Sequence, residues 1–159
     1  ASSFFVFEDL QDQENKNFQA LITNRKNYLK SLRYLGDNWI SGKSVQPNEK
    51  ALTIGNEILD YLMQWNSSEF LYQVGSAMSI VMGPIPSGGL TIEISIQPDK
   101  RLYINILNNA KIDLELDNQG YFSDVVSTEE SYKYKIAEFL SETGIWGNNS
   151  GWRNIIQVC

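Results

Sequence analysis

The 159-residue chain contains no histidine and only one cysteine, Cys159. Without histidine, the Ser-His and Cys-His nucleophile pairs and most zinc sites are excluded. A single cysteine cannot form an intrachain disulfide, so we expect a reducing compartment and a cytoplasmic protein. The sequence also lacks an apolar run of about 18 residues, so we predict neither a membrane-spanning segment nor a membrane partner.

Positive charge is scarce as well. The chain has 13 Lys and Arg against 19 Asp and Glu, for a net charge of −6. An acidic surface repels phosphate backbones, so we expect no nucleic acid partner and favour another protein, a basic one in particular. The only basic cluster lies on a predicted helix, where a solvated helix face is the favoured interpretation. It consists of Arg25, Lys26, Lys30 and Arg33.

Size and composition fit a single domain over residues 1–159, with 42% hydrophobic residues. We divide it into an N-terminal arm (1–16), a core (17–144) and a C-terminal tail (145–159). Within the arm, the pattern favours an edge strand over 3–7, followed by a loop or the start of a helix.

Helical spacing of apolar residues predicts two helices, over 17–35 and 47–65. Gly36 is expected to end the first helix, and Pro47 to occupy the first turn of the second. Gly55 lies inside the second helix, where it is predicted to cost about 1 kcal/mol relative to alanine.

After residue 76 the pattern changes to the two-residue alternation of β-strands. Strands are predicted near 76–82 and over 90–97, 101–106, 112–116 and 121–126, joined by turns at 83–89, 98–100, 108–109 and 117–120. Turns this short make neighbouring strands antiparallel. We therefore predict an α+β fold: a three- to five-stranded antiparallel β-meander with two N-terminal helices and one C-terminal helix packed on one face. The last helix should begin at Ser127 or Thr128 and end at Gly144.

One face of this predicted sheet is aliphatic, and the other is polar. The polar positions are Glu93, Asn105, Asp113, Glu115 and Asp117. The last three should lie on one side of a strand, about 7 Å apart. They fit either a hard-cation site or acid/base pair, or a solvated face. The solvated face is favoured because the acids spread along a line, so we predict no metal, no cofactor and no catalytic residue.

Two segments carry a resemblance to a family. The first is Leu35-Gly36-Asp37-Asn38-Trp39, followed by Gly42, Pro47 and Ala51, and the second runs from Pro84 through Gly88-Gly89 to Glu93. Together they resemble small uncharacterised bacterial proteins that have a Trp-Asp-Gly-type loop, a proline-led helix and a Pro-x-x-x-Gly-Gly-hydrophobic-x-hydrophobic-Glu β-meander. The chain departs from that pattern at Ile40, in place of aspartate, and after Glu93, where the usual tryptophan is missing.

The resemblance implies a partner-binding role in mobile or defence-like gene neighbourhoods. Trp39 either plugs the edge of the core or forms a binding groove with Glu93 and the Gly88-Gly89 turn, which we expect close to the Trp39 loop. Our leading hypothesis is a non-catalytic interaction or accessory module, antitoxin-like or defence-associated. The alternatives are a carboxylate-dependent hydrolase or metal-binding protein that uses the polar sheet face, and a homo-oligomer that assembles through residues 145–159.

Overall fold

The computed structural model describes residues 2–64, 78–97, 100–118, 121–127 and 132–142. Helices α1 (Ser2–Leu32) and α2 (Glu49–Met63) precede a five-stranded sheet, and helix α4 (Tyr132–Glu142) follows it. The strands are β1 (Ser79–Pro84), β2 (Leu90–Gln97), β3 (Lys100–Ile106), β4 (Ile112–Asn118) and β5 (Tyr121–Ser127). They lie side by side in chain order, each antiparallel to the next. The predicted α+β meander is confirmed.

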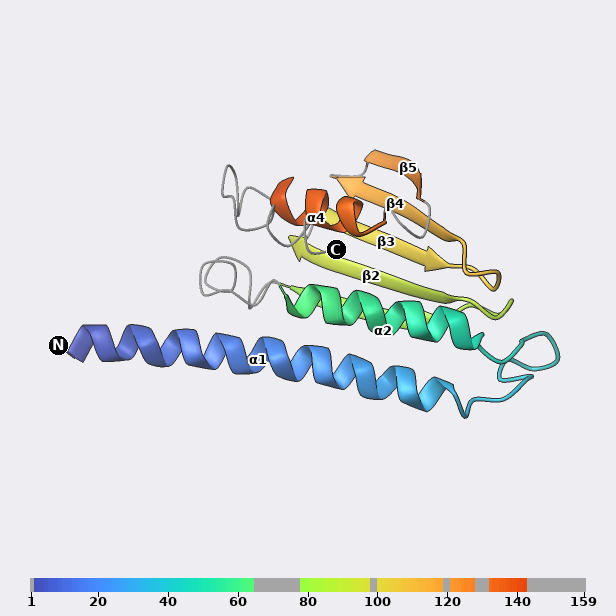
Figure 1. Cartoon of the computed structure of the whole chain (residues 1–159), viewed down its shortest axis with the longest axis horizontal. Helices are drawn as coiled ribbons and strands as arrows, with labels where there is room; N and C mark the ends of the chain where they lie inside the picture. The colour runs from blue at the N-terminus through green and yellow to red at the C-terminus, as the bar shows by residue number, and fades with distance from the viewer. Residues whose placement is uncertain (1, 65–77, 98–99, 119–120, 128–131, 143–159) are drawn as a thin grey trace.

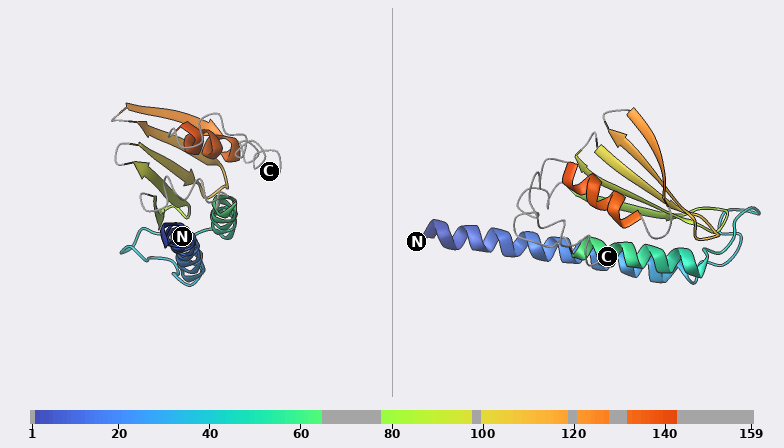
Figure 2. Two further views of the ribbon diagram at one scale, coloured as in Figure 1. Left: turned by 90° about the vertical axis from the view of Figure 1, so that its left-hand side faces the viewer. Right: turned by 45° about the horizontal axis from the view of Figure 1, so that its top comes forward.

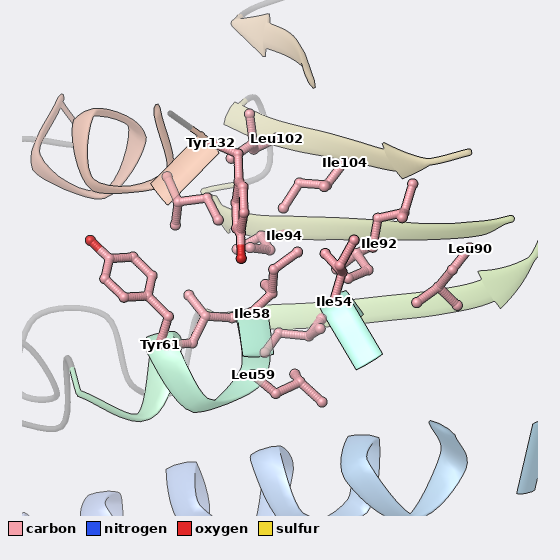
Figure 3. Close-up of a cluster of buried hydrophobic side chains, with 14 of the residues drawn as sticks. Ile54, Ile58, Leu59, Tyr61, Leu90, Ile92, Ile94, Leu102, Ile104 and Tyr132 are labelled. Carbon is pink, nitrogen blue, oxygen red and sulfur yellow. The ribbon is translucent and has the colours of Figure 1, made fainter. Parts of the chain in front are cut away.

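All three helices lie on one side of the sheet (Figure 1; Figure 2, right). We call the face beneath them the inner face and the opposite one the outer face. Helix α1 packs beside α2 and β1, whereas α2 packs on β2 and β3. The core forms between the inner face and the helices: α2 and α4 contribute to it (Figure 3), and so does α1 through Phe18, Ile22, Leu29 and Leu32. Its inner-face residues are at most 4% exposed: Ile80, Leu90, Ile92, Ile94, Ile96, Leu102, Ile104, Ile106, Ile112 and Leu114.

Helix α1 is longer than predicted. It begins at Ser2, so the predicted strand over 3–7 is wrong. For the residues after that strand we considered a loop or the start of a helix, and the loop is wrong as well. Residues 2–32 contain no glycine or proline that would interrupt a helix. The helix predicted from the apolar spacing of the later residues therefore continues back to the start of the described chain. At its other end the helix stops at Leu32, and Gly36 adopts a positive φ of 78° four residues later.

Helix α2 begins two residues later than predicted. Asn48 is its N-cap, and its side chain accepts a hydrogen bond from the Lys50 amide at 2.8 Å, so Pro47 lies outside the helix. Gly55 is buried where α2 approaches the sheet, and a Cβ there would lie 2.6 Å from Leu90 Cδ2. An alanine at this point would need Leu90 to shift, which opposes the predicted gain from alanine.

The turns differ from prediction in detail. Strand β1 continues through Gly83 to Pro84, which pairs with Leu90, because an edge strand tolerates proline. In the β3–β4 turn the left-handed residue is Ala110, with φ 67°, rather than either asparagine. Ser127, one of the two predicted starts of the last helix, is instead the final residue of β5, and α4 is described from Tyr132. The other predicted start, Thr128, the predicted end at Gly144 and the tail 145–159 lie outside the described residues. Within the described part of the chain, no helix combines the length and apolarity needed to cross a membrane.

Candidate functional site

The register of the sheet aligns the polar side chains of the outer face into cross-strand rows. The rows are Ser79–Ser95–Arg101–Asp117, Val81–Glu93–Tyr103–Glu115 and Gly83–Thr91–Asn105–Asp113. Five of the six candidate residues therefore share one face, and only Trp39 lies elsewhere. The rows also contain Thr91, Arg101 and Tyr103, which sequence reasoning passed over although they follow the same two-residue alternation as Glu93 and Asn105.

Arg101 lies among the acidic residues of the face. Its Nη1 is 3.5 Å from Glu93 Oε1, and its side chain is 44% exposed. A hydrogen bond to the Tyr103 side chain, with the charges of Tyr103, Glu93 and Asp117, raises the pKa of Arg101 further above its ordinary value. The guanidinium is thus permanently charged, but because the pair is exposed it adds little to stability.

Polar groups of the third row differ in how well they are satisfied. Thr91 Oγ1 donates to Asn105 Oδ1 at 2.8 Å. In the neighbouring strand, Asp113 Oδ1 is buried without a hydrogen-bond partner. A Cβ placed on Gly83, at the β1 end of this row, would meet no atom within 4 Å. The row therefore combines open space at one end with an unsatisfied acceptor at the other.

The outer face is strongly negative. Across β2 to β4 it presents four carboxylates, Glu93, Asp113, Glu115 and Asp117, against the single cation Arg101. Their register keeps them apart, and no group of three or more potential metal ligands gathers among the described residues. The arrangement attracts cationic groups across a surface and does not converge on one atom.

The same face carries an apolar spot. Val81, on the edge strand β1, is 55% exposed and lies in the row of Glu93 and Tyr103. The three helices lie on the opposite side of the sheet (Figure 2). Val81 and Tyr103 share their row with the carboxylates of Glu93 and Glu115. Aliphatic, aromatic and charged groups also occur together in protein interfaces, where a polar rim surrounds the apolar groups.

The free edge of β1 is closed to another strand. Arg25 Nε donates a hydrogen bond to the Ile80 carbonyl at 2.5 Å, and Pro84 has no N–H to offer. Edge strands protected in this way do not pair readily with a further strand. Addition of a further strand at this edge is therefore disfavoured.

The basic cluster on α1 is tied into the fold. Besides the contact of Arg25 with β1, Lys26 pairs with Asp60, and Arg33 Nη2 lies 3.0 Å from Glu49 Oε1. The first pair joins α1 to α2, and the second joins the residue after α1 to the first residue of α2. The side chains of both pairs remain partly exposed, so the pairs add little to stability. The interpretation as a solvated face is incomplete only because three of the four members have partners.

Trp39 belongs to the loop between α1 and α2. Its indole Nε1 donates to the Val45 carbonyl at 2.9 Å, and the ring is half-buried outside the main core cluster. Trp39 thus braces its own loop and does not plug the edge of the core. Glu93 lies about 10 Å along β2 from the turn at Leu90, with its side chain on the outer face. The structure does not bring the two residues into one groove.

The expected closeness of this loop to the glycine turn is confirmed. Val45 N donates to Pro86 O at 2.9 Å, and Asn48 N donates to Gly88 O at 2.8 Å. A Cβ on Gly89 would lie 2.3 Å from Ile106 O, so this glycine lets the turn pack against the end of β3. The turn is a structural corner.

A hollow of about 230 Å³ lies away from the outer face. It is lined by Glu49, Lys50, Thr53, Ile54, Glu57 and Ala110, between α2 and the β3–β4 turn. None of the six candidate residues lines it.

No protein-family model, curated protein or solved structure shows significant similarity to the chain.

Proposed function

We propose that this protein is a non-catalytic binding module that docks a basic protein partner on the outer face of its sheet. One observation carries the proposal: a sheet face on which none of the described helices packs, and which presents four carboxylates, one arginine and an exposed valine. Such a surface steers positively charged partners and raises the rate of association.

The other sequence hypothesis, a carboxylate-dependent hydrolase or metal-binding protein, has weaker support. Acid/base chemistry or a hard cation needs oxygen ligands that converge within a few ångströms. Here Glu93 and Glu115 lie on strands that are separated by β3, and Asp113, Glu115 and Asp117 alternate along a single strand. The geometry suits a row of separate contacts with a partner better than it suits one reacting atom.

The biological setting of this role follows from the resemblance and from composition. A partner-docking module fits an accessory, antitoxin-like or defence-associated role in a bacterial cell. A reducing compartment such as the cytoplasm is compatible with a single cysteine. Trp39 enters this proposal only as a brace for the loop that adjoins the sheet.

The proposal is tested by affinity capture from the native host with quantitative mass spectrometry. Three baits are compared: the unmodified chain, an outer-face variant (Glu93→Lys with Glu115→Lys) and a matched variant (Glu57→Lys with Glu138→Lys). Both variants change the net charge equally, but Glu57 and Glu138 are exposed on helices.

We expect at least one basic protein to be retained by the unmodified and matched baits and to fall by about tenfold or more with the outer-face bait. Equal loss of the partner from both variant baits would show that retention depends on net charge and not on the outer face. Retention of every partner by the outer-face variant would remove the outer face as the docking surface. Thermal melts of the three baits establish that all are folded.

A further inference from the structure

Exposed large hydrophobic residues of the described chain are concentrated in one loop. Four of the seven lie in the α1–α2 loop (residues 33–48), and a fifth is Val81 on the outer face. The loop residues are Tyr34, Leu35, Ile40 and Val45, with exposed fractions of 88%, 38%, 48% and 52%. Clusters of exposed apolar side chains on a folded surface mark interaction sites more often than isolated ones do.

Hydrogen bonds hold this loop in one shape. Gln46 connects both ends of the loop: its Nε2 donates to Leu32 O at 2.7 Å, and its Oε1 accepts from the Gly36 amide. Its own amide donates to Asp37 Oδ1 at 2.8 Å. Ser44 Oγ, in turn, accepts from the Ile40 amide at 2.6 Å. A loop fixed in this way loses little conformational entropy on binding, so its exposed apolar groups are pre-organised for a partner.

The charge of the loop differs from that of the outer face. The loop, residues 33–48, carries two cations (Arg33, Lys43) against one carboxylate (Asp37) in a chain whose net charge is −6, and Arg33 is paired with Glu49 of α2. Lys43 is exposed in the loop, between Ile40 and Val45. The loop therefore combines exposed apolar side chains with an exposed lysine, whereas the outer face presents carboxylates beside Val81.

We infer that the α1–α2 loop of one copy docks on the outer face of a second copy. This inference rests on the proposed function of the outer face as a docking surface, but it places there one loop of an acidic second copy in place of a separate basic protein. Lys43 would approach Glu93 and Glu115, and the exposed aliphatic groups around Ile40 would cover Val81. The loop cannot reach the outer face of its own chain, because Val45 and Asn48 are hydrogen-bonded to the β1–β2 turn.

Such a contact joins two different surfaces, so it is heterologous. Each added copy leaves one loop and one outer face free, and assembly continues unless the rotation between copies closes a ring. The inference therefore predicts species larger than dimers, which a self-complementary contact between identical surfaces does not produce.

The test is sedimentation velocity of the purified full chain from low to high micromolar concentration. A loop variant (Ile40→Ser with Lys43→Glu) is compared with the outer-face variant (Glu93→Lys with Glu115→Lys) and with the Glu57→Lys, Glu138→Lys control. We expect the unmodified chain and the control to grow in mass with concentration, and either of the other two variants to weaken self-association by about tenfold or more. An equimolar mixture of those two should form a species of two chains, because each retains the surface that the other has lost.

Several results would overturn the inference. The inference is overturned if the unmodified chain stays monomeric at every concentration. It is also overturned if either the loop variant or the outer-face variant self-associates as strongly as the unmodified chain. A mixture that fails to form the two-chain species indicates contact between identical surfaces. These outcomes are separate from failure of the proposed function: if the outer-face bait still loses its basic host proteins, the face remains a docking surface, and its occupant is a different protein.

Discussion

The two faces of the sheet are built from alternate residues of the same strands, yet they differ in burial and in their contribution to stability. Ile92 and Ile104 on the inner face are 0% exposed, whereas their chain neighbours Glu93 and Tyr103 on the outer face are partly exposed. Burial of a large aliphatic side chain contributes about 1.5–3 kcal/mol, and an exposed ion pair about 0–1 kcal/mol. Stability therefore resides mainly on one face, which leaves the charge of the other face free to vary.

The largest contrast is expected from truncating an inner-face residue at the centre of the sheet. Ile104→Ala should lower the free energy of unfolding by about 2–5 kcal/mol, because Ile104 is completely buried and the sheet cannot collapse into the space. Urea denaturation followed by circular dichroism measures the change. The neighbouring outer-face substitution Asn105→Ala is the control, and a loss as large as that of Ile104→Ala would contradict the division between the faces.

A second contrast concerns the close approach of α2 to the inner face. Gly55→Ala should destabilise the protein by about 1–3 kcal/mol, because the new methyl group would overlap the buried Leu90 side chain. Helix propensity alone predicts the opposite, a gain of about 1 kcal/mol. Denaturation of this variant decides between the two, and the double variant Gly55→Ala, Leu90→Val should recover part of the loss.

Gly55 also shows where sequence reasoning stops. The two-residue alternation of residues 90–116 predicted the meander, its buried face and the common face of Glu93, Asn105, Asp113, Glu115 and Asp117. Alternation reports which residues share a face, but it carries no information on how closely a helix approaches that face. The close approach of residue 55 to Leu90 therefore appears only in three dimensions.

The expectations for Trp39 and the N-terminal arm failed for related reasons. The Trp39 indole is held by the carbonyl of Val45, a contact between loop residues that no periodic pattern encodes. In the arm, phenylalanine-rich spacing favoured a strand locally, whereas the helix that follows extends through it. A local preference for a strand is weak beside a helix that is already formed, because extending a helix costs less free energy than starting one.

The smallest effects are expected on the outer face itself. Asp113→Asn should stabilise the protein by about 1 kcal/mol, because it replaces a carboxylate that has a buried oxygen without a hydrogen-bond partner. Glu115→Gln, two residues away on the same strand, should change stability by less than about 0.5 kcal/mol. Parallel thermal melts compare them. Destabilisation by Asp113→Asn would mean that the carboxylate has a structural role in the fold.

The most direct test of the outer face as a docking surface is site-specific photocross-linking in host extract. A benzophenone amino acid replaces Tyr103 on the outer face or, as the matched control, Tyr134, which is 47% exposed on α4. The outer-face account predicts cross-linked partner, whether a basic host protein or a second copy of the chain, from residue 103 and little from residue 134. Equal cross-linking from both positions, or cross-linking from residue 134 alone, would contradict it.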